Sequence, residues 1–272
     1  MFKSRLISGV LLVILALVTV GSGGYILAAT LWLISLIAFQ ELCLACKIQD
    51  NGKKQNTLEV VGYIFTTLYY IDMAILKNYQ LMIMIAIMAL VVLLVVYVFK
   101  FPKYHASQVM STYFAFIYAP VLFSFVYLTR ELEYGVYFVW VIFISSWISD
   151  TCAYCVGMLF GKHKLAPVLS PKKSIEGSIG GIVGSAIVGA LFGYFVVEQA
   201  ITSAQVTWVF ALIGGCGSIV SQIGDLAASA IKRNYDIKDY GKLIPGHGGI
   251  MDRFDSVLIT APIIYFMFTL LV

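Results

Sequence analysis

Residues 80–99 read QLMIMIAIMALVVLLVVYVF, twenty consecutive positions without a charged side chain. A helix needs roughly 20 apolar residues to cross the hydrocarbon core of a bilayer, so this stretch predicts a transmembrane helix. Of the 272 residues in the chain, 61% are hydrophobic and only 12% are charged. That charged fraction is about half of what a typical soluble domain carries. We therefore expect an integral membrane protein rather than a soluble one.

Eight further stretches of similar character lie along the chain. The nine predicted helices cover about residues 5–22, 24–43, 57–76, 80–99, 107–128, 135–160, 177–197, 204–231 and 253–272. They predict an all-α fold, a polytopic integral membrane bundle of about nine transmembrane helices. Helices 1–5 form an N-terminal region (1–130), and helices 6–9 with their loops form a C-terminal region (131–272) of the same membrane domain. A signal peptide is an alternative for the first stretch, because Lys3 and Arg5 precede it, although no usual cleavage site follows.

Small residues recur every four positions in the seventh predicted helix. They are Gly177, Gly181, Ser185 and Gly189. Such a stripe lets two helix backbones approach closely. It predicts a helix–helix contact rather than a ligand site.

Basic residues fall almost entirely on one side of this arrangement. The N-terminus and the loops after helices 2, 4, 6 and 8 carry 16 of the 18 lysine and arginine residues, and Lys77 and Arg130 are the other two. Cytoplasmic loops of membrane proteins carry such an excess. We expect the N-terminus and these loops to be cytoplasmic, and the lack of a transit-like leader favours a bacterial inner (plasma) membrane.

Acidic residues occur at three places inside or at the ends of predicted helices, where charge is costly and usually functional. Asp150 lies in the sixth helix, and Asp225 lies on a polar stripe of the eighth. Asp252 and Asp255 begin the ninth helix and share a face, being three residues apart. Each place has a structural alternative: a buried acid paired with a neighbouring helix, polar packing along the stripe, or capping of the ninth helix.

The loop before the ninth helix is the most charged part of the chain. Residues 232–256 read KRNYDIKDYGKLIPGHGGIMDRFDS. Carboxylates suit Mg²⁺, which prefers oxygen ligands and partners substrate phosphates. Basic side chains suit phosphate oxygens, and glycines permit close approach of a ligand to the backbone. The combination predicts Mg²⁺–polyphosphate chemistry at the membrane surface. The basic residues in question are Lys172, Lys173, Lys232, Arg233, Lys238, Lys242 and Arg253.

Two CxxC pairs, Cys43–Cys46 and Cys152–Cys155, allow a zinc site as an alternative. Both pairs lie in or beside apolar helices without histidine nearby. Free cysteine often behaves as a small buried hydrophobe. We therefore expect structural cysteines rather than zinc ligands.

The charged loop also resembles a known signature. The pattern S-A-I-K-R-x4-K-D-x-G-x2-I-P-x-H-G-G-x2-D-R-x-D, from Ser229 to Asp255, is similar to that of the phosphatidate cytidylyltransferase (CDP-diacylglycerol synthase) family. The blocks SDTCAYCVGMLFGKHKLAPVLSPKKSIEG and SQIGDL resemble it too, so the strong likeness covers about residues 140–256. Departures are alanines at 227 and 228, where the family often has a bulky residue and a glutamate, Cys152 in place of a small residue, and Ser174 in place of threonine.

The resemblance implies an enzyme that makes CDP-diacylglycerol and pyrophosphate from CTP and phosphatidic acid in the membrane. It implies Mg²⁺ as cofactor, with one or two metal ions left open, and a catalytic cavity on the cytoplasmic side of the C-terminal region. A homodimer is compatible with it, and no nucleic-acid partner is expected.

The expected site residues follow from the motif and from the residue types. Catalytic residues are expected to be Asp225, Lys232, Arg233, Lys238, Asp239, His247, Asp252, Arg253 and Asp255. Nucleotide binding is expected from Lys172, Lys173, Gly248 and Gly249. Metal binding is expected from Asp225, Asp252, Asp255 and Asp150.

Two other functions compete with this interpretation. A CTP-dependent lipid or polyprenol kinase would transfer the γ-phosphate and release CDP. A cation-coupled transporter would use Asp150 and Asp225 as buried ion or proton sites. Transporters often contain inverted repeats, and the sequence shows none.

Overall fold

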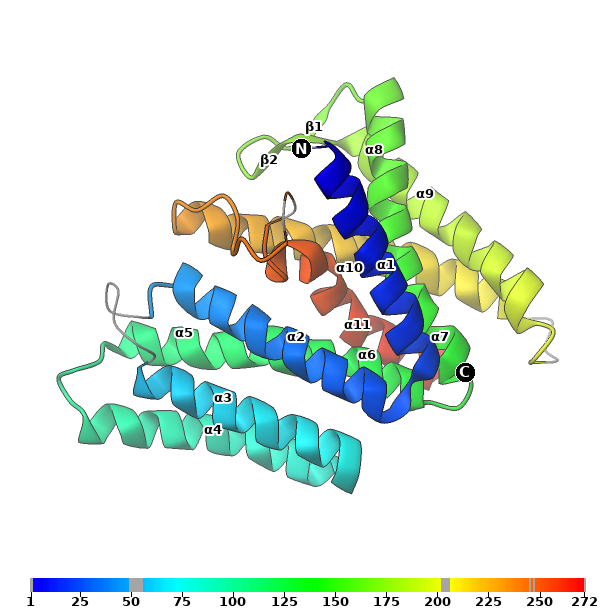
Figure 1. Cartoon of the computed structure of the whole chain (residues 1–272). Coiled ribbons are helices and arrows are strands. Elements are labelled where there is room, and N and C mark those ends of the chain that lie inside the picture. The colour runs from blue at the N-terminus through cyan, green and yellow to red at the C-terminus, as the bar shows by residue number, and fades with distance from the viewer. Residues whose placement is uncertain (1, 49–55, 202–205, 245, 247, 272) are drawn as a thin grey trace. The chain divides into compact units, whose positions relative to one another are not determined.

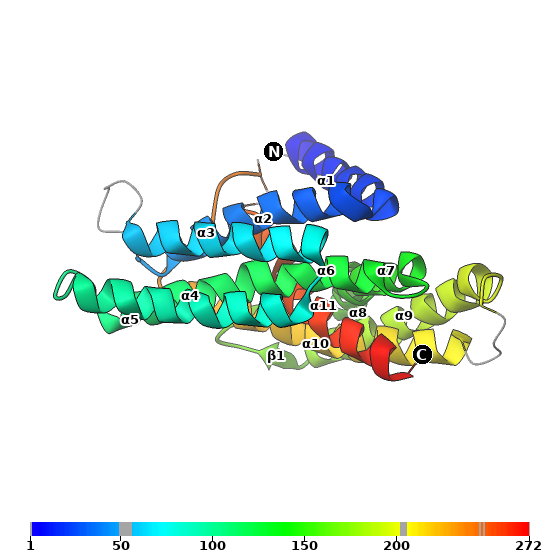
Figure 2. The ribbon, with the colours of Figure 1, turned by 90° about the horizontal axis from the view of Figure 1, so that it is seen from below.

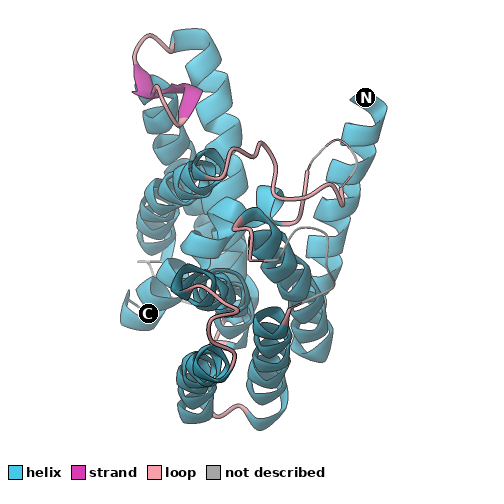
Figure 3. Ribbon diagram, turned by 90° about the vertical axis from the view of Figure 1, so that its left-hand side faces the viewer, coloured by secondary structure: helices cyan, strands magenta, loops and turns pink. Residues whose placement is uncertain are grey.

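The computed structural model describes residues 2–48, 56–201, 206–244, 246 and 248–271. Helices dominate the described part of the chain (Figures 1 and 3). They are α1 (Phe2–Ser22), α2 (Gly24–Ala45), α3 (Thr57–Ile71), α4 (Tyr79–Phe99), α5 (Ala106–Phe116), α6 (Leu122–Glu131), α7 (Gly135–Phe143), α8 (Ser149–Phe160), α9 (Ile175–Phe192), α10 (Val206–Asn234) and α11 (Met251–Leu271). Four π-helical turns extend or join them: η1 (Asp72–Leu76), η2 (Ile117–Val121), η3 (Ile144–Ile148) and η4 (Gly193–Val197). One hairpin, β1 (Lys164–Ala166) and β2 (Ser170–Ser174), connects α8 to α9.

The prediction of a polytopic α-helical membrane protein is confirmed. Each of the nine predicted spans coincides with one helix or with helices joined by a π turn. Among the described residues, eight helices are long and apolar enough to cross a membrane: Gly24–Ala45, Thr57–Leu76, Tyr79–Phe99, Ala106–Glu131, Gly135–Phe160, Ile175–Val197, Val206–Asn234 and Met251–Leu271. The apolar part of α1 is shorter and covers Ser8–Ser22.

Helix ends follow local polar signals. The side chain of Asn56 accepts a hydrogen bond from the Glu59 N–H, and the Glu59 carboxylate accepts one from the Asn56 N–H, which makes a reciprocal cap for α3. Asn78 caps α4 through the N–H groups of Gln80 and Leu81. The π turn η2 contains Pro120, which lacks an N–H and therefore interrupts the regular helical ladder.

The chain forms two compact units. The first unit comprises Met1–Tyr127 and Tyr235–Arg253, and the second comprises Leu128–Asn234 and Phe254–Val272. The predicted C-terminal region, residues 131–272, therefore contributes the segment 235–253 to the first unit and the rest to the second.

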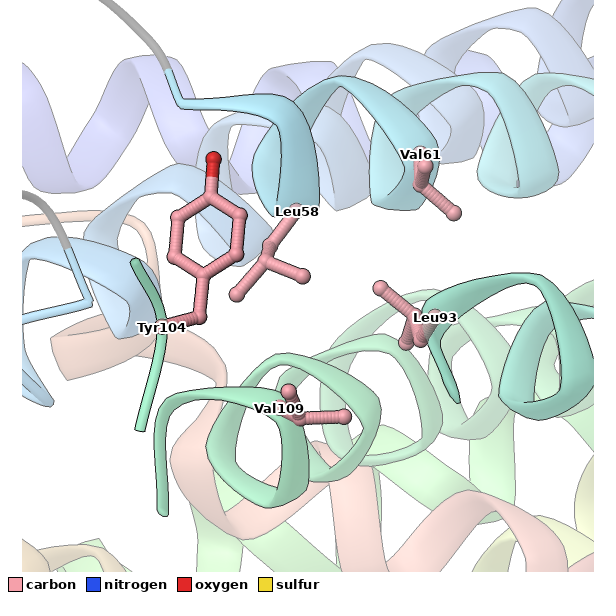
Figure 4. Packing of buried hydrophobic residues seen from close by; sticks show 5 residues of the cluster. All are labelled: Leu58, Val61, Leu93, Tyr104 and Val109. Carbon is pink, nitrogen blue, oxygen red and sulfur yellow. The ribbon is translucent and has the colours of Figure 1, made fainter. Parts of the chain in front are cut away.

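In the first unit, α3, α4 and α5 pack side by side (Figure 2). Five buried residues form an apolar cluster between these helices and the loop before α5 (Figure 4). They are Leu58, Val61, Leu93, Tyr104 and Val109. The hydroxyl of Tyr104 accepts a hydrogen bond from the Thr57 N–H, so the cluster also secures the start of α3.

In the second unit, α9 packs closely against both α8 and α10. The buried residues of α9 are the predicted small-residue stripe itself: Gly177, Gly181, Ser185 and Gly189. A Cβ atom added at Gly189 would lie 2.5 Å from the carbonyl oxygen of Phe210 on α10. The predicted helix–helix contact is therefore confirmed, and at Gly189 it is a backbone contact that leaves no room for a side chain.

Replacing Gly189 by leucine is expected to destabilise the second unit by about 1–3 kcal/mol, because the contact atom is backbone and cannot rotate away. The apparent melting temperature in detergent should fall by several degrees. Ile187→Leu on the exposed face of the same helix is the matched control and should leave it unchanged. Equal melting temperatures for the two variants would contradict the close contact.

Candidate functional site

A pocket of about 300 Å³ opens in the second unit between α8, β2, α9 and α10. Three predicted site residues lie on its wall: Asp150 from α8, and Lys172 and Lys173 from β2. Gln222 of α10 lies there too, and apolar side chains such as Met158 and Leu165 complete part of the lining. Residues that are far apart in the sequence are thus brought to one cavity with both charged and apolar surface.

The hairpin that carries the two lysines is anchored to the start of α9. Ser174 caps this helix by accepting a hydrogen bond from the Gly177 N–H at 3.1 Å. The Glu176 carboxylate accepts hydrogen bonds from the N–H groups of Lys162 and His163, at 3.1 and 3.2 Å. It also contacts the His163 Nδ1 at 2.6 Å. Glu176 escaped the sequence analysis, although its place in the first turn of a helix after a serine is a recognisable signal.

Asp225 forms an ion pair with Lys173. Both side chains are about one-quarter exposed, at 27% and 25% respectively, so the pair is partly shielded from solvent. The ion pair connects α10 to the pocket wall. It also orients the ammonium group of Lys173, which is otherwise a flexible point charge.

Asp255 lies deeper, with 8% of its surface exposed. Its Oδ1 accepts a hydrogen bond from the Ser256 N–H at 2.8 Å. The charges of Asp225, Lys232 and Asp150 act on its carboxylate. Three predicted residues thus lie near enough to Asp255 for their charges to act on it. We call Asp150, Asp225, Lys232 and Asp255, together with Lys173, the charged cluster.

Two further polar residues of α10, Ser218 and Gln222, form hydrogen bonds to neighbouring helices. Gln222 accepts a hydrogen bond from the Ser178 hydroxyl at 2.5 Å and donates one to the Ser178 carbonyl oxygen at 3.2 Å. The hydroxyl of Ser218 lies 2.7 Å from that of Ser149 on α8. Ser218 and Gln222 thus form hydrogen bonds between helices, and Gln222 also lies on the pocket wall, whereas Asp225 pairs with Lys173.

In the first unit, Asp252 at the start of α11 binds the backbone of the loop that precedes this helix. Its Oδ2 accepts hydrogen bonds from the N–H groups of Tyr240 and Gly249, at 2.8 and 3.0 Å. A second contact within the loop is an antiparallel bridge, in which the Ile244 N–H donates to the Gly248 carbonyl oxygen at 2.8 Å. Gly248 has a φ of +83°, a conformation that side chains other than glycine rarely adopt. The N–H of Gly249, a residue expected to bind nucleotide, donates to the Asp252 carboxylate.

Glu41 of α2 also binds this loop, and the sequence analysis missed it. Its carboxylate accepts hydrogen bonds from the N–H groups of Ile250 and Met251, at 3.0 and 2.8 Å. An acid inside an apolar span is a signal for function, and that signal was present in the second predicted helix.

The remaining predicted residues lie on the surface or outside the described part of the chain. Arg233, Lys238, Asp239 and Arg253 are exposed. His247 lies outside the described residues. Their predicted roles in binding phosphate rest on the sequence.

The cysteines show no sign of a zinc site in the described residues. All five are free thiols, and Cys43 is buried. Burial raises the pKa of the Cys46 thiol. In the described part of the chain, no three histidine, cysteine, aspartate or glutamate side chains lie close enough together to hold a metal ion.

The chain is similar to known proteins over nearly its whole length. Residues 3–271 match the sequence profile of the Cytidylyltransferase family. A phosphatidate cytidylyltransferase of Staphylococcus haemolyticus (strain JCSC1435) is 33% identical over 269 residues, which cover 96% of this chain and 97% of that protein. One of Staphylococcus saprophyticus is 31% identical over 262 residues, with the same coverage of 96% and 97%. One of Bacillus subtilis (strain 168) is 35% identical over 188 residues, 68% of each chain.

Proposed function

The chain belongs to the cytidylyltransferase family, and on that premise we propose that it transfers the cytidylyl group of CTP to phosphatidic acid. The products are CDP-diacylglycerol and pyrophosphate. The full-length likeness to bacterial phosphatidate cytidylyltransferases supports the lipid substrate. The structural observation that carries the proposal is the pocket of the second unit, where two lysines and a carboxylate meet apolar side chains.

This transfer needs no nucleophile from the protein, because the phosphate of phosphatidic acid can itself attack CTP. A phosphate oxygen of phosphatidic acid attacks the α-phosphorus of CTP, the bond from that phosphorus to the bridging oxygen breaks, and pyrophosphate leaves with the electron pair. The second pKa of a phosphomonoester is about 6, so the phosphate of phosphatidic acid is already largely ionised at neutral pH. What remains for the protein is to place two anions together and to offset their charge.

The side chains of the pocket suit that task. The ammonium groups of Lys172 and Lys173 can neutralise phosphate oxygens, and the ion pair with Asp225 holds Lys173 in place. Apolar wall residues such as Met158 and Leu165 suit the part of the lipid next to its phosphate. The acyl chains would stay in the bilayer, which the long apolar helices are built to span.

The donors of the charged cluster fit a Mg²⁺ ion. Asp225 and Asp255 offer carboxylate oxygens, and Mg²⁺ in proteins usually takes one or two carboxylates together with substrate phosphates. Because no three carboxylate, histidine or cysteine side chains lie together among the described residues, substrate phosphates would have to supply further oxygen ligands. When bound, the ion would offset negative charge on the phosphates. Asp150 on the pocket wall and Asp252, assigned from the sequence, remain further candidates.

The distribution of basic residues supports an orientation with the N-terminus and the loop before α11 in the cytoplasm, where CTP is found. The apolar helices and the bacterial source of the full-length relatives support a bacterial membrane, which we propose is the inner (plasma) membrane.

The direct test uses purified protein, phosphatidic acid, Mg²⁺ and CTP labelled separately at the α- and γ-phosphates. We expect α-label in the lipid and γ-label in pyrophosphate. Label from the γ-position in the lipid would instead identify a kinase, and unlabelled lipid in both reactions would reject phosphoryl and cytidylyl transfer alike. A reaction without phosphatidic acid is the control.

A further inference from the structure

Glu41 is an acid in the apolar helix α2 whose two carboxylate oxygens both bind backbone of the loop before α11. Oε1 accepts from the Ile250 N–H at 3.0 Å, and Oε2 accepts from the Met251 N–H at 2.8 Å. The residue is 6% exposed. Its partners lie 209 and 210 positions further along the chain. A buried carboxylate bonded in this way holds two distant segments of the first unit together.

Two glycines of the loop are explained by the same carboxylate. A Cβ atom added at Gly241 or at Gly249 would overlap the Glu41 carboxylate oxygens. Neither glycine has a positive φ, so backbone conformation does not require them. A side chain at either position would have to displace the Glu41 carboxylate from its hydrogen bonds, because the loop backbone lies directly against it. The close packing of the loop backbone against α2 at Glu41 thus accounts for both glycines.

The contact also completes the N-terminus of α11. The first N–H groups of a helix lack partners within the helix, and a negative charge there is stabilising. The residue before this helix, Ile250, has no side-chain acceptor and cannot cap it. Glu41 supplies the missing acceptor from α2, while Asp252 binds the N–H groups of Tyr240 and Gly249 from within the loop. Two carboxylates therefore hold the loop in one conformation.

We propose that Glu41 is a positioning residue for the cytidylyl-transfer reaction. It fixes the loop and the first turn of α11, which carries Asp252 and Arg253, and it does not itself touch a substrate. This inference rests on the proposed function, because the loop and the first turn of α11 carry seven residues that the sequence assigns to the site: Lys238, Asp239, His247, Gly248, Gly249, Asp252 and Arg253.

The test compares Glu41→Gln and Glu41→Asp with wild type. Glutamine keeps the size of the side chain but faces one of the two N–H groups with a donor, and that group is then left without an acceptor. We expect kcat/KM to fall at least tenfold, with KM for CTP raised at least fivefold. A loss of folded enzyme would lower kcat alone. Glu41→Asp keeps the charge and should recover part of the lost activity.

Hydrogen–deuterium exchange supplies a second measurement that does not depend on turnover. In Glu41→Gln, the amides of peptides covering residues 240–251 should exchange at least tenfold faster than in wild type, and the rest of the first unit should be unchanged. Glu59→Gln is the matched control, because Glu59 is also a buried carboxylate that caps a helix of the same unit. It should leave both the kinetics and the exchange at 240–251 within twofold of wild type.

The outcomes separate the possibilities. Wild-type exchange at 240–251 in Glu41→Gln would overturn the contact itself. Faster exchange with unchanged kcat/KM and KM would overturn the positioning role. If Glu41→Gln does not fold, the same criteria apply to Glu41→Asp. If wild type transfers no cytidylyl group in the labelling test, the proposed function fails, whereas the exchange measurement still decides whether Glu41 holds the loop.

Discussion

Replacement of Asp225 by asparagine is expected to lower kcat/KM for cytidylyl transfer by about a thousandfold, the upper part of the range for losing one preorganised electrostatic group. The amide has nearly the same shape but no charge, so two functions are lost together. Lys173 loses its ion-pair partner, and the charged cluster loses one of the two carboxylates proposed to bind Mg²⁺. The measurement is the initial rate of α-label transfer into lipid at several CTP and Mg²⁺ concentrations.

Glu133→Gln serves as the control for this variant. It makes the same carboxylate-to-amide change at an exposed position of the second unit, away from the pocket. Its kcat/KM should stay within twofold of wild type. If Asp225→Asn kept more than a tenth of wild-type activity, the carboxylate would have no essential role. Recovery at high Mg²⁺ would point to metal binding rather than to the Lys173 ion pair.

The second large effect is expected for Lys173→Met, with a loss of about a hundredfold in kcat/KM, since a charged donor in a partly buried site is removed. Methionine keeps the length of the apolar stem, so the pocket wall is retained. Lys173→Arg keeps the charge and should lose much less. The measurement is again the rate of α-label transfer, combined with binding of CTP by equilibrium dialysis.

Lys164→Met is the matched control for Lys173→Met. Lys164 is an exposed lysine of β1 in the same hairpin, paired with Ser174, and it lies outside the pocket lining. The double variant Asp225→Asn/Lys173→Met adds a sharper test. Residues in direct contact are not additive, so the double variant should be scarcely worse than Asp225→Asn alone. Fully multiplicative losses would show that the two residues act independently.

The apolar runs were enough to predict the helices, because the length of a span is a local property of the sequence. The stretch 80–99 corresponds to α4 at Tyr79–Phe99, and the stripe from Gly177 to Gly189 is the buried face of α9. Charge and residue type also indicated Asp150, Asp225 and Asp255, which the structure places with Lys173 or Lys232 in the second unit. A carboxylate inside an apolar helix is costly enough to stand out without any structure.

The partners of these acids were decided only by the tertiary structure. Asp252 carried the same sequence signal as Asp255, yet its Oδ2 binds the backbone of its own loop in the first unit, whereas Asp255 lies among charged side chains in the second. The sequence analysis assigned no role to Glu41 of α2, and only the fold shows that the N–H groups of Ile250 and Met251 donate to it. Spacing along a helix determines which face a residue occupies, but its hydrogen-bond partner depends on which distant segment packs against that face.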